Sequence, residues 1–245
     1  MHHFFADKNY IDNEFITIKG SDVNHIKNVL RMRKGDELLI SDGEDKDYYC
    51  KIDELSDEEI KAKILEIDKG GNELDTEFYL FQCLPKGDKM ELIIQKAVEL
   101  GVKEIIPVSS KRAIVKLDDK KAEAKVKRWN SISESAAKQS GRIIIPQVKK
   151  PISFREAVKY AEAMDMAVIP YENFKDMTET RQVIDKMQSG MRIGIFIGPE
   201  GGFDGNEIEM AVEAGIERIS LGRRILRTET AGMTILSILM FKMER

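Results

Sequence analysis

Short apolar segments separated by turn residues occupy the first 70 residues of the chain. The segments that have the length and the β-branched and aromatic content of strands are 15–18, 37–41, 48–52 and 60–67. A helix that begins at Ser21 and Asp22 is predicted after the first of them, because apolar residues recur there at helical spacing: Val23, Ile26, Val29 and Leu30. This pattern predicts a small antiparallel β unit, which we interpret as a barrel.

From residue 78 onward, strands alternate with longer amphipathic helices. The predicted strands cover 78–84, 105–108, 166–169, 193–197 and 219–221. The predicted helices cover 88–100, 119–140, 153–163, 178–187, 205–214 and a last one from 228. Such alternation is typical of an α/β domain with a mainly parallel sheet. Because 69–72 (KGGN) is read as a linker, the predicted domains are 1–72 and 73–245.

Composition narrows the class of protein. The 245 residues carry a net charge of −4 and are 42% apolar, which is typical of a globular chain and excludes a collagen-like or disordered one. Cys50 and Cys83 belong to no Cys/His cluster, so we expect no metal site and no disulfide framework. The chain starts without a signal-peptide pattern, and its longest apolar region, 231–241, is shorter than the roughly 20 residues of a membrane span. We therefore expect a cytoplasmic protein that has no membrane segment.

Basic residues are concentrated in two parts of the chain. Residues 111–155 contain 13 Lys or Arg and 4 Asp or Glu, an excess of the kind that attracts phosphate backbones. A smaller basic cluster lies at 25–34 within the otherwise acidic first segment. For the run at 119–128, a solvated helix face paired with nearby acidic residues explains the charges equally well.

In an open parallel sheet, ligands bind beyond the carboxyl ends of the strands. After the predicted strand 193–197 comes the glycine-rich turn 198–203 (GPEGGF), with Asp204 or Gly205 available to cap the next helix. The turn matches neither the dinucleotide fingerprint nor the P-loop. A carboxylate within it, Glu200, would repel phosphate, so a cationic cofactor such as S-adenosylmethionine fits better than ATP. A plain tight turn without a ligand explains the same residues.

Two further strand ends carry candidate functional residues. The segment 220–231 contains Arg223, Arg224 and Arg227, followed by Thr228 as a possible helix cap, and the segment 169–173 (IPYEN) follows another strand. The last helix is apolar nearly all round, which either a homodimer interface or a central core position explains. All three histidines lie in the first 25 residues, so a hydrolytic triad or a metalloenzyme site in the α/β domain is disfavoured.

Taken in order, several motifs resemble one family. They are 25–33 (HIKNVLRMR), 96–102 (KAVELGV), 106–107 (IP), 137–142 (AKQSGR), 197–202 (IGPEGG) and 221–231 (LGRRILRTETA). The chain thereby resembles the bacterial 16S rRNA uracil-N3-methyltransferases of RsmE type, in the SPOUT class. The resemblance covers essentially the whole chain and departs from the family pattern at Lys138, where an acidic residue is expected.

This resemblance implies a fold and a cofactor. The fold would be an N-terminal PUA-like β-barrel and a C-terminal SPOUT α/β domain with a deep trefoil knot, assembled as a homodimer. The cofactor would be S-adenosyl-L-methionine, bound at the three strand ends. The residues implied to bind it are Tyr171, Glu172, Gly198, Pro199, Glu200, Gly201, Gly202, Leu221, Gly222, Ile225, Leu226 and Thr230.

The implied reaction is methylation of N3 of a uridine in the decoding region (helix 44) of 16S rRNA, with free rRNA or the 30S subunit as substrate. The neutral imide must lose its proton, so we assign Glu229 as base or orienting carboxylate and Arg227 or Arg223 as its electrostatic partner. A helix-dipole or ion-pair role explains Glu229 equally well. The candidates for binding rRNA phosphates are Lys27, Arg31, Arg33, Arg112, Arg128 and Arg142. Two alternatives stay open: a SPOUT enzyme that methylates tRNA or a ribose 2′-hydroxyl, and a non-catalytic RNA-binding assembly factor.

Overall fold

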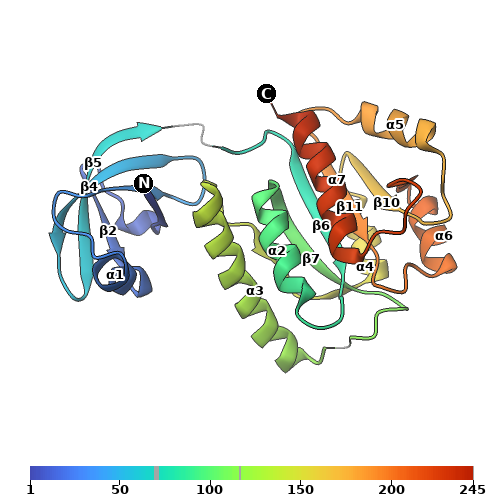
Figure 1. Cartoon of the computed structure of the whole chain (residues 1–245), viewed down its shortest axis with the longest axis horizontal. Helices are drawn as coiled ribbons and strands as arrows, with labels where there is room; N and C mark the ends of the chain where they lie inside the picture. Colours follow the sequence, from blue (N-terminus) through green and yellow to red (C-terminus); the bar gives the residue numbers. More distant parts are fainter. Residues whose placement is uncertain (69–71, 116, 245) are drawn as a thin grey trace. The chain divides into compact units, whose positions relative to one another are not determined.

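The computed structural model describes residues 1–68, 72–115 and 117–244 and divides into two compact units (Figure 1). The first unit consists of Met1–Glu73 together with Ala137–Ile145, and the second of Leu74–Ala136 and Pro146–Arg245. The sequence placed the division at 72/73 and assigned all later residues to the second domain, whereas the structure adds 137–145 to the first unit. Most of the predicted linker, 69–71, lies outside the described residues.

A curled five-stranded sheet forms the first unit, in the order β1-β3-β4-β5-β2. Its strands are β1 (His2–Phe5), β2 (Phe15–Lys19), β3 (Glu37–Ser41), β4 (Asp47–Leu55) and β5 (Glu59–Asp68). Buried and more exposed positions alternate along β2 and along β3 as far as Ile40, because successive side chains of a strand point to opposite faces. The antiparallel prediction is correct for β2 to β5, but β1, which was not predicted, pairs with β3 in parallel.

The helix of the first unit departs from the predicted spacing. It begins as α1 (Ser21–Asn24) and continues as a turn of π-helix, η2 (His25–Val29), closed by a hydrogen bond from the Leu30 N–H to the His25 carbonyl. Val23 and Ile26 are buried as predicted, but Val29 is 61% exposed. A π-helical turn holds more residues than an α-helical one, so it rotates Val29 away from the buried face. The chain then turns sharply at Arg31, whose φ is 55°.

A parallel sheet in the order β12-β10-β11-β6-β7-β8 forms the second unit, with β9 also paired to β7. Its strands are β6 (Glu77–Cys83), β7 (Val102–Ser109), β8 (Gln147–Val148), β9 (Ile152–Ser153), β10 (Met166–Pro170), β11 (Arg192–Ile197) and β12 (Glu217–Ile219). The helices are α2 (Lys89–Glu99), α3 (Asp119–Ser140), α4 (Phe154–Ala161), α5 (Met177–Lys186), α6 (Gly205–Glu213) and α7 (Thr228–Met243). The predicted α/β architecture is thus observed.

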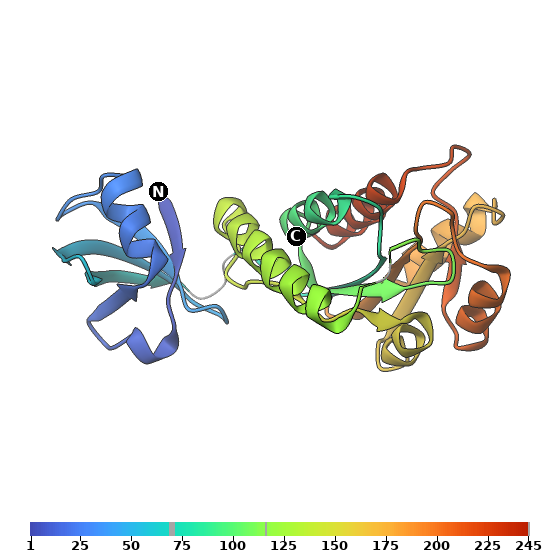
Figure 2. The same cartoon turned by 90° about the horizontal axis from the view of Figure 1, so that it is seen from below.

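Helices cover both faces of this sheet. Figure 2 shows α2 and α7 together over one face, with α4 and α6 on the other. Under α4 and α6 lies a core of buried aromatic and aliphatic residues, in which Phe81 and Phe196 stack with ring centroids 4.4 Å apart. Full burial of such a side chain stabilises the fold by about 1.5–3 kcal/mol. This packing holds the carboxyl ends of β10 and β11 in place, because Ile169 and Phe196 belong to the core.

The last helix buries one side and exposes another. Gly232, Ile235, Leu236 and Leu239 of α7 are buried, whereas Phe241 is 83% exposed. Arg227 occupies the N-cap of α7 without a side-chain capping bond, so the prediction that Thr228 caps this helix was wrong. Among the described residues, no helix has both the length and the apolar content that a membrane crossing needs.

Candidate functional site

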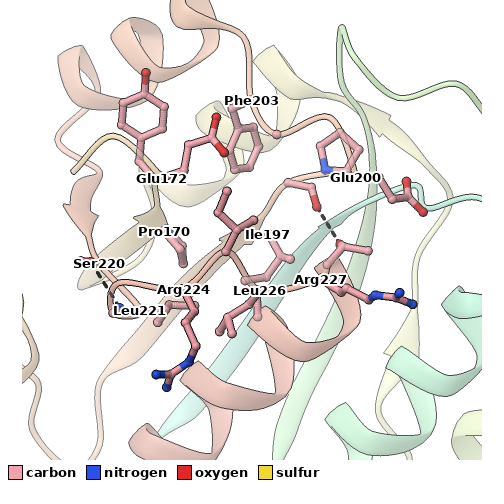
Figure 3. A pocket seen from close by; sticks show the side chains of 18 of the residues that line it. Pro170, Glu172, Ile197, Glu200, Phe203, Ser220, Leu221, Arg224, Leu226 and Arg227 are labelled. Carbon is pink, nitrogen blue, oxygen red and sulfur yellow. Dashed lines mark hydrogen bonds between the residues drawn. The ribbon is translucent and has the colours of Figure 1, made fainter. Parts of the chain in front are cut away.

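A pocket of about 560 Å³ opens at the carboxyl ends of β10, β11 and β12 (Figure 3). This volume lies in the range of small-molecule sites. Parallel pairing of these strands brings the segments after them to one edge of the sheet, although they are far apart in the sequence. The residues that line the pocket are Lys89, Pro170, Tyr171, Glu172, Lys175, Ile197, Gly198, Pro199, Glu200, Gly202, Phe203, Ser220, Leu221, Gly222, Arg223, Arg224, Ile225, Leu226, Arg227, Thr228 and Ala231.

The turn after β11 is closed by its own backbone. The N–H of Gly202, which has a φ of +66°, donates a hydrogen bond to the Pro199 carbonyl over 2.9 Å. A side chain at Gly198 would place its Cβ 3.2 Å from the ring of Phe203, so only glycine fits there without movement of that ring. Asp204 caps α6, as one of the two predicted candidates, in a capping box with Glu207.

Thr228 joins this turn to the sheet and to α7. Its Oγ1 donates a hydrogen bond to the Gly198 carbonyl (2.7 Å) and accepts one from Nε2 of the fully buried Gln82 (2.9 Å). Gln82 is on β6, so these bonds connect β6, the turn after β11 and the start of α7. The pocket wall is therefore held in place by buried polar contacts.

The segment after β12 forms the opposite wall. Its start is held by hydrogen bonds from the Ser220 N–H to Thr180 Oγ1 and from the Tyr171 N–H to the Ile219 carbonyl. Further along, Ile225 is 86% exposed although it is apolar. A wall with exposed apolar side chains and a fixed backbone suits a planar aromatic ligand group.

Cations dominate the rim of this pocket. Arg223, Arg224 and Arg227 are exposed, and within the described residues none of their guanidinium groups has an ion-pair partner. Figure 3 shows the Arg224 and Arg227 side chains extending in different directions from their segment. Unpaired guanidinium groups of this kind suit phosphate oxygens.

The carboxylates of the pocket differ in their surroundings. Glu200 Oε1 accepts hydrogen bonds from the Lys89 ammonium (2.7 Å) and the Lys86 backbone N–H (3.1 Å). Burial acts to raise the pKa of Glu200, but the bonds from Lys89 and from backbone N–H groups outweigh it and lower this pKa. Glu172 is exposed, faces the turn near Phe203, and has no ion-pair partner among the described residues. The carboxylate that is free to meet a cationic ligand is thus Glu172, whereas the sequence indicated Glu200.

The structure brings together most of the cofactor residues predicted from the sequence. Ten of them line the pocket: Tyr171, Glu172, Gly198, Pro199, Glu200, Gly202, Leu221, Gly222, Ile225 and Leu226. Gly201 and Thr230 are not part of its lining. Sequence reasoning missed Lys89, which follows β6, because only three strand ends were considered. The segment 85–88 (PKGD), which follows the predicted strand 78–84, was the signal that could have identified it.

Of the predicted catalytic residues, Arg223 and Arg227 line the pocket and Glu229 does not. The Glu229 side chain, in the first turn of α7, is 15% exposed. Its Oε2 is buried without a hydrogen bond among the described residues and lies 3.8 Å from the Lys89 ammonium. Glu229 therefore lies next to the pocket, and it contacts Lys89, which lines the pocket.

The predicted RNA-binding residues fall into different surroundings. Arg31 and Arg33 are exposed, and neither guanidinium has an ion-pair partner among the described residues. Lys27 pairs with Asp57 at 2.5 Å. In the second unit, Arg112 donates to the Gly201 carbonyl at 3.2 Å. Arg128 there forms a double contact with the carboxylate of Glu91.

Arg142 requires a correction. It is only 4% exposed, and its guanidinium forms a bidentate pair with Glu73 within the first unit. Because its charge is buried and compensated, Arg142 is not available to RNA phosphates, contrary to the prediction. Lys138, the departure from the family pattern, pairs with Asp22 in the same unit at 3.0 Å.

Over the described ranges, no group of three or more His, Cys, Asp or Glu side chains is placed to hold a metal ion.

Comparison with known proteins gives a consistent result for both units. A family model described as "RNA methyltransferase domain" matches residues 72–240, and one described as "RNA methyltransferase PUA domain" matches residues 18–65. The "Ribosomal RNA small subunit methyltransferase E" of Bacillus subtilis (strain 168) is 36% identical over 231 residues, which are 93% of this chain and 90% of that protein.

Solved structures resemble the whole chain. One is ribosomal RNA small subunit methyltransferase E from Neisseria gonorrhoeae bound to S-adenosyl methionine, with a TM-score of 0.86 and 32% identity, covering 99% of this chain and 98% of that one. Another is a methyltransferase from Legionella pneumophila with the bound cofactor SAM, with a TM-score of 0.86 and 30% identity, covering 98% and 97% of the two chains. These likenesses confirm the predicted PUA-like sheet and the α/β domain.

Proposed function

Because this chain belongs to the family of RNA methyltransferases that carry a PUA domain, we propose that it transfers a methyl group from S-adenosylmethionine to N3 of a uridine in the decoding region (helix 44) of 16S rRNA. The names of its relatives support a small-subunit rRNA as the substrate. The observation that carries the proposal is the pocket, where three segments separated in the sequence meet at one sheet edge.

The residues of the pocket fit S-adenosylmethionine. Leu221, Ile225 and Leu226 offer apolar surface and backbone groups for the adenine. The turn 198–202 allows close approach of its backbone to the ribose and the methionyl part. Glu172 offers a carboxylate without an ion-pair partner, among the described residues, to a positively charged group of the ligand. When bound, S-adenosylmethionine supplies an electrophilic methyl group on a sulfonium.

The chain's own residues would orient the RNA and bind its phosphates. N3 lies on the Watson–Crick edge of uracil, so the target base must be unpaired or turned out of its helix. Arg223, Arg224 and Arg227 at the rim would bind the phosphates on either side of that base. The walls of the pocket would exclude water from the reacting atoms.

The first unit would add contacts to the RNA. Arg31 and Arg33 are exposed beside the π-helical turn, and Lys27 is partly exposed on the same segment. These three cations would bind phosphates and contribute a salt-dependent part of the affinity. Arg112 and Arg128 stay candidates in the second unit, where Arg112 contacts the Gly201 carbonyl and the Asp204 carboxylate, and Arg128 contacts Glu91.

We propose a homodimer for the same protein. Ile238 and Phe241 lie three residues apart on one exposed side of α7. Such an apolar strip on a helix suits a second copy of the chain, which would also explain why α7 is apolar nearly all round. The deep trefoil knot in the second unit likewise stays a proposal that rests on the family resemblance.

Two measurements test the proposed function. Calorimetric titration of the protein with S-adenosylmethionine and with its demethylated product should give saturable binding, and an absence of binding would favour a non-catalytic assembly factor. Mass spectrometry of 16S rRNA from a deletion strain should show loss of 3-methyluridine, restored by the intact gene. An unchanged 3-methyluridine content, with a modification lost from tRNA or from a ribose 2′-hydroxyl, would contradict the proposed target.

A further inference from the structure

One lysine of the pocket lies between two carboxylates that come from other elements. Lys89 is the first residue of α2, and its ammonium lies 2.7 Å from Glu200 Oε1 and 3.8 Å from Glu229 Oε2. Glu200 belongs to the turn after β11 and Glu229 to the first turn of α7. All three side chains are partly or largely buried. Three segments of the second unit thus meet at this ammonium.

Helix stability does not explain a lysine at this place. A cation in the first turn of a helix faces the positive end of the helix dipole, which costs about 0.3–1 kcal/mol. The preceding residue, Asp88, makes no side-chain capping bond that would compensate. The contact with Glu200 does explain it, since this hydrogen bond raises the pKa of Lys89 and keeps the ammonium charged. The contact with Glu200 in the pocket, and not the stability of α2, therefore accounts for a lysine at position 89.

Glu229 adds an acceptor that lacks a donor. Its Oε2 is buried, accepts no hydrogen bond in the part of the chain that the structure describes, and is too far from Lys89 for a direct one. Leaving a buried acceptor without a donor costs on the order of 1–3 kcal/mol. Glu229 thus places a second negative charge beside Lys89.

We propose that Lys89 and Glu200 together recognise the imide edge of the target uracil. This inference rests on the proposed function and specifies the base that the same pocket accepts. Uracil presents a carbonyl oxygen, which is an acceptor, directly beside N3–H, which is a donor. Lys89 presents a donor beside the Glu200 acceptor, 2.7 Å apart, so the two edges are complementary. Cytosine has a lone pair at N3, which the Glu200 carboxylate repels.

The same pair can take the proton that N3 must lose. The N3–H proton passes to the Glu200 carboxylate, which becomes a carboxylic acid, and the negative charge that remains is shared by the two carbonyl oxygens of the imide. One of these oxygens accepts a hydrogen bond from Lys89. As Lys89 turns its hydrogen bond from Glu200 to the base, Glu200 loses its counter-ion and becomes a stronger base. Glu229 keeps the ammonium at the pocket during this exchange.

The substitution Lys89→Met tests the proposal with the full-length protein and 30S subunits from a deletion strain. We expect calorimetry to give an affinity for S-adenosylmethionine within about twofold of the wild type, and single-turnover methylation at pH 7 to fall by about 10²–10³-fold. The deficit should shrink as the pH rises toward the pKa of the uridine imide, because the base then loses its proton to solvent. Lys103→Met removes the same charge at the amino-terminal end of β7, the opposite edge of the sheet, and should leave the rate unchanged.

A second variant separates recognition from folding. Glu200→Gln keeps the size of the side chain, and its amide can donate to the lone pair of cytosine N3. With 30S subunits that carry cytidine in place of the target uridine, we expect this variant to show a weaker preference for uridine than the wild type.

Three results would overturn the inference: an unchanged rate in Lys89→Met, a deficit that is equal at every pH, or an unchanged base preference in Glu200→Gln. A wild-type protein that binds no S-adenosylmethionine would instead contradict the proposed function.

Discussion

The hydroxyl of Thr228 donates a hydrogen bond to the carbonyl oxygen of Gly198 over 2.7 Å, and through this contact the first residue of α7 holds the turn after β11. Gln82 completes the arrangement by donating to the same hydroxyl. The wall of the pocket therefore depends on side chains that themselves stay buried, which makes the site sensitive to changes away from any ligand.

The first prediction concerns Thr228→Val, which keeps the shape of the side chain and removes the hydroxyl. The Gly198 carbonyl then lacks the donor that Thr228 supplies, and Gln82 Nε2 loses one of its two acceptors while it keeps the Cys83 carbonyl, so we expect a decrease of about 1–3 kcal/mol in the free energy of unfolding. The affinity for S-adenosylmethionine should fall by about tenfold, since the turn is no longer fixed. Urea denaturation and calorimetry measure the two effects.

Thr234→Val is the matched control for this prediction. Thr234 is on the same helix, and its hydroxyl donates to the Thr230 carbonyl one turn earlier. This substitution should change the free energy of unfolding by less than about 0.5 kcal/mol. Equal effects of the two substitutions would show that the contact with Gly198 has no special importance.

The second prediction concerns Arg142, which the structure assigns to the stability of the first unit. Arg142→Ala leaves the Glu73 carboxylate partly buried without its counter-ion. We expect the free energy of unfolding to fall by about 3–5 kcal/mol. Joint replacement of Glu73 and Arg142 should cost less than the sum of the two single changes, as a double-mutant cycle would measure. A variant that folds as stably as the wild type and binds RNA more weakly would restore the original assignment.

Arg142 also shows where sequence reasoning reaches its limit. It lies in a strongly basic segment, and charge counting cannot distinguish a solvated arginine from one that is paired with a carboxylate 69 residues away. The same limit applies to Lys89, because its partner Glu200 is 111 residues distant. Contacts at such separations are created by the tertiary fold, which no local pattern encodes.

The local patterns were more informative. The alternation of strands and helices predicted the parallel sheet, and the rule that ligands bind at carboxyl ends of strands indicated the three segments that meet at the pocket. The ten residues in these segments that line the pocket were implied by the family resemblance. β1 was missed because four residues at the amino terminus form a strand only through pairing with β3. Val29 was misplaced because a helical period assumes α-helical turns, whereas the chain forms a π-helical one.

The third prediction concerns Arg31 and Arg33 in the first unit. Charge reversal of both, as Arg31→Glu with Arg33→Glu, should weaken the binding of 16S rRNA. It should also reduce the slope of log K against log salt by about 1 for each phosphate that the protein no longer binds. The affinity for S-adenosylmethionine should not change, because neither residue lines the pocket. Filter binding over a range of salt concentrations measures the slope.

Charge reversal of Lys19 and Lys63 provides the control for this experiment. These lysines lie in the same unit and already pair with Glu59 and Glu14. Replacing both by Glu makes the same change in net charge as replacing Arg31 and Arg33. If the control pair reduced the salt slope as strongly, the effect would come from total charge and not from contacts at Arg31 and Arg33.

The fourth prediction concerns the exposed side of α7. Phe241→Glu places a charge where the proposed dimer buries an apolar ring, and Phe241 contributes little to the fold of its own chain because it is 83% exposed. We therefore expect light scattering coupled to size-exclusion chromatography to give a dimer for the wild type and a monomer for the variant at micromolar concentration, with an unchanged circular dichroism spectrum. Val212→Glu, on an exposed apolar position of α6, makes the same kind of change elsewhere and should leave the dimer intact. A wild-type monomer would contradict the proposed dimer. A dimer that survives Phe241→Glu would place the interface on another surface, because an interface centred on this ring cannot bury an unpaired carboxylate without a cost of several kcal/mol.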